Sequence, residues 1–164
     1  MTLATHAVVG SAIASLVPTH PVIGFCAGFL SHFLLDSIPH WDYPLKSDSI
    51  NPSKGGALKL DKNVIIDLSC IGFDIGLGLA FSIAFFISNA PFLPIIIGAC
   101  AGIIPDVLQF VYSRYPKSFL KYLQAFHLWM HAETNLNNRP VLGVSLQALL
   151  IVIVVIACKF FLLA

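Results

Sequence analysis

Long runs of apolar residues, separated by short polar stretches, dominate the chain. Because about 20 helical residues cross the hydrocarbon core of a bilayer, runs of this length predict membrane helices. The pattern predicts an all-α fold: a small polytopic transmembrane helical bundle of four or five membrane helices, forming a single membrane domain over residues 1–164. The expected helices cover residues 3–17, 21–36, 64–88, 92–113 and 140–163.

The polar stretches predict the connections between these helices. Two prolines in PTHP, residues 18–21, mark a tight turn between the first two runs. The first run is short, which leaves open a short or partly re-entrant helix packed against the second. Polar loops are expected at residues 37–63 and 114–139. Within the second loop, KSFLKYLQAFHLWMH has apolar residues at helical spacing, which is typical of an amphipathic helix at a membrane interface.

The composition points to an integral membrane protein. Hydrophobic residues make up 57% of the chain and charged residues 10%, with a mean hydropathy of +0.87, whereas soluble domains carry about 25% charged residues. The net charge of +1, without a basic stripe, gives no reason to expect nucleic-acid binding. The four cysteines lie far apart and are interpreted as small apolar residues in helices. No Lys or Arg precedes the first apolar run, so a cleaved signal peptide is not expected.

The distribution of cations predicts the orientation in the membrane. With five crossings, both long loops lie on one face, and by the positive-inside rule this face is cytoplasmic. The expected location is therefore the inner cell membrane, with several crossings. Both Trp and all four Tyr belong to the same face, as in an interfacial aromatic belt. The cations of the two loops are Lys46, Lys54, Lys59, Lys62, Arg114, Lys117, Lys121 and Arg139.

Histidines and aspartates gather at the same predicted level of the bundle. They come from the start of the first and third helices, the ends of the second and fourth, and the second loop, while His20 lies on the opposite side. We interpret this convergence as a polar site. The candidate metal ligands are His6, His32, Asp36, Asp106, His127 and His131, and the candidate catalytic residues are Asp67 and Asp74.

In three of the predicted helices, small residues and candidate ligands follow one another at intervals of four residues, so they lie on the same face of each helix. Faces with small residues at this spacing are those on which membrane helices pack closely. The candidate ligands are therefore expected to point inward, since a lipid-facing Asp costs about 2.5–3.5 kcal/mol on insertion scales. The three series are Ala14, Gly10 and His6; Gly24, Gly28, His32 and Asp36; and Gly98, Gly102 and Asp106.

Several of these residues also have a purely structural interpretation. The i,i+4 pair at the end of the second helix can be a hydrogen-bonded pair, and His127 and His131 can be two interfacial histidines. Asp67 can complement a helix dipole, and His6 can be an ordinary polar group at a helix start. Asp106 can interact with a neighbouring helix only. His40 and Asp42 are interpreted as loop residues, or as side chains that orient a ligand.

The spacing of Asp67 and Asp74 separates their roles. Seven residues correspond to about 10 Å along a helix, so the two carboxylates are not expected on one ion. One is expected to act as ligand or general base, and the other to orient a neighbouring group.

The chemistry of the donors favours zinc as the cofactor, with manganese, iron or magnesium as alternatives. A divalent metal held by His and Asp supports hydrolysis by polarising an oxygen and activating water. The lysine-rich loops attract anionic substrates or headgroups. The expected partners are membrane lipids and a small-molecule or lipid substrate, and the expected reaction is hydrolysis of a phosphoester or lipid headgroup at the cytoplasmic surface.

Four stretches carry a family resemblance: THAVVGSAIAS, SHFLLD, GIIPD and HLWMH. Together they resemble the YdjM-type, LexA-regulated inner-membrane proteins, a family of membrane-bound metal-dependent hydrolase-like proteins. This chain lacks the Asp-His expected after IPD and the Arg and Ser of the HR-x-x-HS-like element, and its elements follow another order. The resemblance implies a metal-dependent hydrolase. His6 matches the early TH of the family, and His32 with Asp36 matches its H-x-x-x-D helix end. His127 with His131 matches the HR-x-x-HS-like element, and Pro105 with Asp106 matches half of the PD-x-DH element.

Two other function classes remain. A non-catalytic membrane or assembly protein is the first alternative. An ion transporter or proton-coupled transporter is the second, but it requires a polar path across the bilayer. The third helix is wholly apolar after Asp74, and the last helix offers only Ser145 and Gln147, which disfavours transport.

Overall fold

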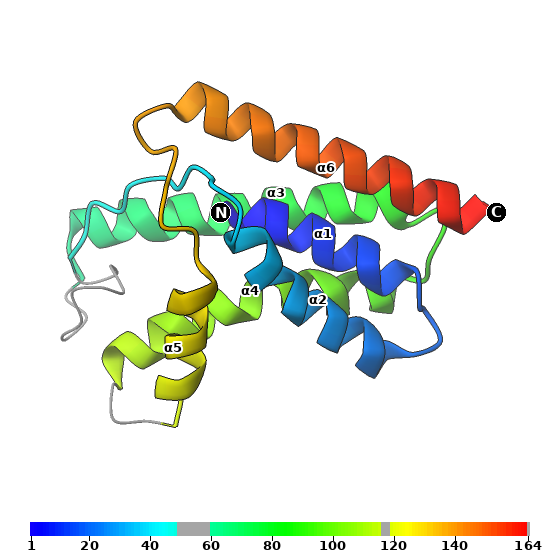
Figure 1. Ribbon diagram of the computed structural model, residues 1–164, viewed down its shortest axis with the longest axis horizontal. Coiled ribbons are helices and arrows are strands. Elements are labelled where there is room, and N and C mark those ends of the chain that lie inside the picture. The colour runs from blue at the N-terminus through cyan, green and yellow to red at the C-terminus, as the bar shows by residue number, and fades with distance from the viewer. Residues whose placement is uncertain (49–59, 116–118, 164) are drawn as a thin grey trace.

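The computed structural model describes residues 1–48, 60–115 and 119–163, apart from the side chain of residue 163. Within these residues the chain forms six helices and no strand, which confirms the predicted all-α class (Figure 1). The helices are α1 (Leu3–Ser15), α2 (Pro21–Asp36), α3 (Lys62–Phe86), α4 (Phe92–Arg114), α5 (Lys121–Met130) and α6 (Pro140–Leu163).

The helix boundaries differ from the predicted ones at a few positions. α3 begins two residues early because the Asp61 side chain accepts a hydrogen bond from the Val64 amide and caps the helix. α1 ends at Ser15 rather than at residue 17, since Pro18 disfavours a helical conformation in the residue before it. The second polar loop contains α5, within the segment predicted as an amphipathic helix.

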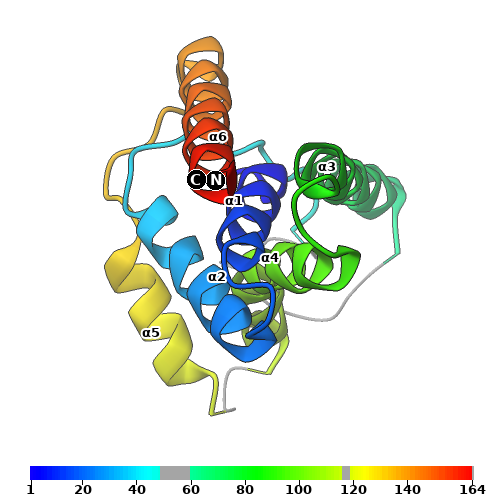
Figure 2. The same ribbon diagram turned by 90° about the vertical axis from the view of Figure 1, so that its right-hand side faces the viewer.

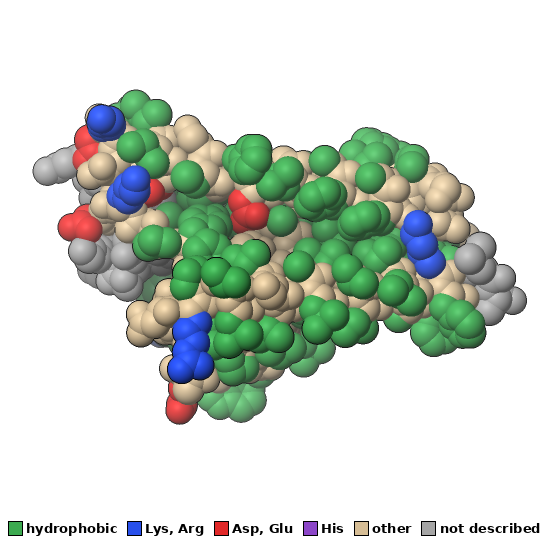
Figure 3. Space-filling view, turned by 90° about the horizontal axis from the view of Figure 1, so that it is seen from above, with side chains coloured by type: hydrophobic (Ala, Val, Ile, Leu, Met, Phe, Trp, Pro, Cys, Tyr) green, Lys and Arg blue, Asp and Glu red, His purple; other side chains and the backbone are tan. Residues whose placement is uncertain are grey.

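Three of the five predicted membrane segments have spanning length. α3, α4 and α6 are long and apolar enough to cross a membrane. α1 and α2 have 13 and 16 residues, fewer than the roughly 20 needed to cross the hydrocarbon core. Hydrophobic side chains make up most of the middle of the face in Figure 3, where one acidic side chain also lies, and Lys and Arg side chains lie toward its ends.

α1 lies at the centre of the bundle, in contact with α2, α3, α4 and α6 (Figure 2). Eleven of its thirteen residues are buried. α5 lies outside α2 and α4, against which it packs at the end of the molecule where α2 and α4 finish. The central position of α1 brings its first turn to the same end as the last turn of α2.

Glycines set the close approach of α1 and α4. A Cβ added at Gly10 would collide with the carbonyl of Gly98, and one added at Gly102 would collide with the carbonyl of His6. A Cβ at Gly28 of α2 would lie 3.2 Å from the Ala101 side chain. The helices therefore pack through the small-residue faces that the spacing predicted, and these faces end in the candidate ligands.

The predicted orientation in the membrane stays a prediction. Lys54, Lys59 and Lys117 lie outside the described residues. Of the described loop cations, Lys62 and Arg114 stand at the ends of α3 and α4 that lie in the same half of the molecule as the candidate ligands.

Candidate metal centre

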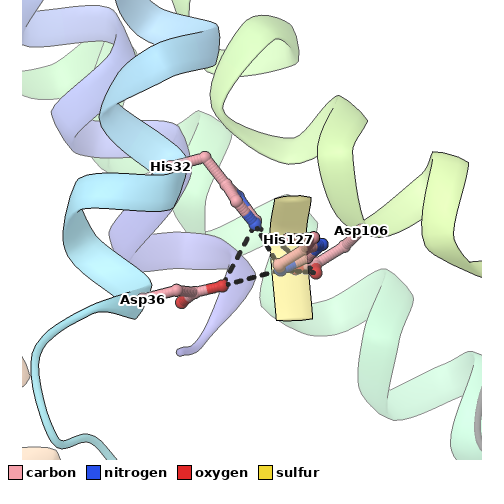
Figure 4. Close-up of side chains that lie close together, drawn as sticks. All are labelled: His32, Asp36, Asp106 and His127. Atoms are coloured by element: carbon pink, nitrogen blue, oxygen red, sulfur yellow. Dashed lines mark hydrogen bonds and ion pairs between the residues drawn. The ribbon is translucent and has the colours of Figure 1, made fainter. Parts of the chain in front are cut away.

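Four side chains from three helices point into one space: His32, Asp36, Asp106 and His127 (Figure 4). His32 and Asp36 lie one turn apart in α2, Asp106 comes from α4, and His127 comes from α5. His32, Asp36 and His127 are 0%, 2% and 3% exposed, and the Asp106 side chain is 31% exposed. The cluster is therefore buried on the α2 side and accessible at Asp106.

The ligand atoms of this cluster have the spacing of a metal site. Asp36 Oδ2 lies 3.1 Å from His32 Nε2 and 3.2 Å from His127 Nε2, and the two nitrogens are 3.4 Å apart. Asp106 Oδ1 lies 3.6 Å from His32 Nε2 and 4.0 Å from His127 Nε2. Corners of a tetrahedron about 2.1 Å from a central zinc are about 3.4 Å apart. The four donors therefore fit around one divalent metal ion.

Backbone contacts fix the tautomer of His32. Its Nδ1 lies 2.8 Å from the carbonyl oxygen of Gly102. A carbonyl only accepts, so Nδ1 carries the proton and Nε2 directs a lone pair at the cluster. Metal-binding histidines characteristically donate their other ring N–H in this way.

His6, the predicted ligand from α1, contacts the same carboxylate from another side. Its Nε2 lies 3.1 Å from Asp36 Oδ1, and its ring stacks on His32 with centroids 4.0 Å apart. His6 is fully buried, and neither ring nitrogen has a hydrogen-bond partner among the described residues. The structure thus places His6 beside the four-residue cluster, against the second oxygen of Asp36.

His131 joins a different group, with Asp36 and His40. One ligand atom from each of these residues lies within 4.8 Å of the others. His40 was interpreted as a loop residue or as a side chain that orients a ligand, because α2 ends before it. The spacing of four residues from His32 to Asp36 repeats from Asp36 to His40, but α2 ends at Asp36, so this spacing does not set the direction of the His40 side chain.

The two predicted catalytic carboxylates contact backbone amides. Asp67 accepts hydrogen bonds from the amides of Lys46 and Ser47, at 3.1 and 2.7 Å. Asp74 accepts from the amides of Leu3 and Ala4, at 2.7 and 3.3 Å. Neither carboxylate belongs to a described group of candidate metal ligands, and their catalytic role stays a prediction.

A positive group already lies at the outer edge of the site. The Met1 ammonium lies 3.1 Å from Asp36 Oδ1 and 2.8 Å from Asp42 Oδ1. Burial raises the pKa of the Asp42 carboxyl, but the neighbouring His40 ring and the Met1 ammonium outweigh burial and hold this pKa below its usual range. Asp42 is therefore a carboxylate, and the site carries negative charge that favours cations.

A cavity of about 510 Å³ meets the cluster at Asp36, Asp106 and His127. Its volume lies within the roughly 300–1,000 Å³ typical of small-molecule sites. The cavity thus has a polar part beside the candidate ligands and an apolar part between two helices. The apolar part is lined by Leu68, Ile71 and Ile75 of α3 and by Ile103, Val107 and Phe110 of α4.

Comparison of the chain with protein-family models, with curated proteins and with solved structures gives no match. The function of the cluster has to be inferred from its own residues. Of the six predicted metal ligands, the structure brings four together around one point and places the other two, His6 and His131, around the same Asp36 carboxylate.

Proposed function

We propose that the protein is a membrane-bound, metal-dependent hydrolase. The observation that carries this proposal is the spacing of the donor atoms of His32, Asp36, Asp106 and His127. Two imidazoles and two carboxylates suit zinc, and manganese, iron or magnesium are alternatives by donor type. A divalent metal held there would polarise a phosphoryl or carbonyl oxygen and lower the pKa of water toward about 7.

Three features around the cluster support this proposal. Gly102 orients His32 through its carbonyl, and α2 presents Asp36 from a buried position. The cavity gives a substrate access on the side of Asp106. Its combination of a polar end and apolar walls favours an amphipathic substrate, and we propose a phosphoester or a lipid headgroup.

We further propose that the protein lies in the inner membrane with the cluster at the cytoplasmic surface. α1 and α2 would complete the bundle of four or five membrane helices around the three of spanning length. Tyr122 and Trp129 of α5 are 73% and 76% exposed, as expected of aromatic side chains in the headgroup region. The resemblance to the YdjM-type proteins supports the same hydrolase class.

Metal content and hydrolysis test the proposal together. The purified full chain should retain a divalent metal by elemental analysis. It should release product from phospholipid vesicles or from a soluble phosphodiester, and the two substrates distinguish a lipid headgroup from a free phosphoester. Chelation should abolish hydrolysis, and the metal alone should restore it. Protein that binds no divalent metal when loaded contradicts the proposal and favours a non-catalytic membrane protein.

Labelling of single cysteines tests the orientation. Cysteines introduced at Lys46 and Lys121 should react with an impermeant reagent only from the cytoplasmic side, because both positions belong to the lysine-containing loops. Reaction of the two positions from opposite sides would contradict the proposed topology.

A further inference from the structure

Asp36 stands between two groups of candidate ligands, and each of its oxygens faces a different group. Oδ2 lies toward His32 and His127, at 3.1 and 3.2 Å. Oδ1 lies toward His40 Nε2, at 3.8 Å, and His131 completes this second group within 4.8 Å. A carboxylate with this division of its oxygens has the arrangement of a bridge between two metal ions.

The second group contains a buried nitrogen that faces two carboxylates. His40 is 2% exposed, and its Nε2 lies 3.3 Å from Asp42 Oδ2 and 3.8 Å from Asp36 Oδ1 without forming a hydrogen bond within the described residues. Its Nδ1 lies 2.7 Å from the Ile38 carbonyl, so Nδ1 carries a proton, and the neutral ring has its lone pair on Nε2. A metal ion at this position would bind the lone pair of this nitrogen and the carboxylates that face it.

His131 repeats this arrangement. Its Nδ1 lies 3.2 Å from the Ala132 carbonyl, which leaves Nε2 as a donor to a metal. The rings of His40 and His131 face one another with centroids 4.9 Å apart. Both histidines of the second group therefore present the same tautomer as His32 does in the first.

Backbone hydrogen bonds hold the second group in place. The amide of Ala132 donates to the Asp36 carbonyl, and the amide of Leu136 donates to the His40 carbonyl, both at 2.8 Å. These bonds pair the chain after α2 with the chain after α5. Because the two histidines and Asp36 lie on segments joined by backbone hydrogen bonds, the backbone already holds the three residues close together.

The charge at this position favours a cation. The Met1 ammonium now lies against Asp36 Oδ1 and Asp42, and His6 Nε2 approaches the same Oδ1 at 3.1 Å without forming a hydrogen bond. A metal ion would take the place of the ammonium as the partner of Oδ1. The donors present there, imidazole and carboxylate, are again those of zinc or manganese.

We propose that the protein holds two divalent metal ions bridged by Asp36, the first with His32, Asp106 and His127 and the second with His40 and His131. This inference rests on the proposed function, since it adds a second ion to the proposed centre. Paired metals about 3.5–4 Å apart serve phosphatases and nucleases by stabilising the attacking and leaving oxygens of a phosphoryl group. Within the proposed substrates, a pair therefore favours a phosphoester.

Metal stoichiometry separates this inference from the proposed function. Full-length protein, stripped with a chelator and reloaded with manganese or zinc alone, should bind about two ions per chain. His40→Ala and His131→Ala should each bind about one. The matched control, His20→Ala, should bind as many as the unchanged protein, because His20 lies at the far end of α2 from Asp36. If the unchanged protein binds one ion and neither variant binds fewer, the second metal site is contradicted and the first stands. If the unchanged protein binds no ion, both metal sites are contradicted.

A spectroscopic measurement keeps the inference testable if a variant fails to fold. In the unchanged protein loaded with manganese, electron paramagnetic resonance should show an exchange-coupled pair. His131→Gln, which keeps a polar side chain of similar length, should show the spectrum of isolated manganese instead. An uncoupled spectrum in the fully loaded, unchanged protein would rule out the bridge.

Discussion

α1 and α6 are both apolar helices, yet α1 lies at the centre of the molecule and α6 at its surface. α1 is short and contains four Ala, two Ser and one Gly, and eleven of its thirteen residues are buried at the centre of the bundle. α6 is long and rich in Val, Ile, Leu and Phe, and Val141, Ile156 and Phe160 are 82%, 64% and 70% exposed. Side-chain size therefore separates the two helices more clearly than hydropathy does.

The difference follows from how helices associate in lipid. Lipid tails are as apolar as leucine, so large apolar side chains gain little by turning inward, whereas small ones let backbones approach closely. Close approach buries the backbone of α1 and brings the Ser11 hydroxyl to a partner, the Ile95 carbonyl, to which it donates at 2.8 Å. Small residues thus determine which helix lies at the centre and, through it, where the ligands meet.

The largest expected effect comes from replacing a glycine at the α1–α4 contact. In Gly102→Val, the new side chain collides with the His6 carbonyl, and backbone cannot move aside as a side chain can. Overpacking of this kind costs typically about 1–3 kcal/mol, and we expect a loss at the upper end of this range. Separation of α1 from α4 would also displace Asp106, so metal content should fall. Thermal unfolding in detergent and elemental analysis measure the two effects.

Removal of a ligand of the first metal ion should sharply weaken the binding of that ion. His32→Ala deletes one of four donors, and we expect affinity to fall by more than the roughly 10–100-fold that loss of an orienting partner costs. Asp36→Ala and Asp106→Ala should also lower metal content and hydrolysis sharply. Expression and folding are measured first, since an unpaired buried group is itself destabilising.

His20→Ala is the matched control for these variants. His20 is the residue before α2, at the end opposite to Asp36, and its side chain makes no capping hydrogen bond. It is also exposed, so neither metal content nor hydrolysis should change. If His20→Ala loses the metal while well-folded His32→Ala retains it, the assignment of the site is wrong.

The sequence allowed the centre of the molecule to be predicted better than its edge. Spacing of four residues predicted the packed faces of α1, α2 and α4, because a regular helix converts spacing into direction. It also brought His32, Asp36 and Asp106 into one set of candidates. His40 was not among the candidate ligands, because its position depends on an irregular segment fixed by long-range backbone hydrogen bonds such as that from Leu136.

The same limit applies to Asp67 and Asp74. Their spacing along α3 predicted that they would not share an ion, and neither belongs to a described group of candidate ligands. Their contacts with the backbone near Leu3 and Lys46 join segments far apart in the chain. No local pattern indicates such partners.

A smaller effect is expected at the start of α1, where Asp74 accepts hydrogen bonds from the Leu3 and Ala4 amides. Asp74→Ala removes the acceptor for these amides, and loss of such a cap costs about 1 kcal/mol. Asp74→Asn keeps an acceptor oxygen and should keep most of the stability. The predicted catalytic role requires more: hydrolysis must be lost in Asp74→Asn while stability and metal content are retained.

The smallest expected effect uses two glycines of α3 that differ only in what they face. A Cβ at Gly76 would have no atom within 4 Å, whereas one at Gly78 would lie 2.7 Å from the Ala4 Cα of α1. Alanine is favoured over glycine in a helix interior by about 1 kcal/mol. Gly76→Ala should therefore raise the unfolding temperature slightly, and Gly78→Ala should lower it because α3 must move away from α1. Equal shifts of the unfolding temperature in the two variants would show that close contact with α1 does not limit side-chain size on α3. The central position of α1 would then need a cause other than its small residues.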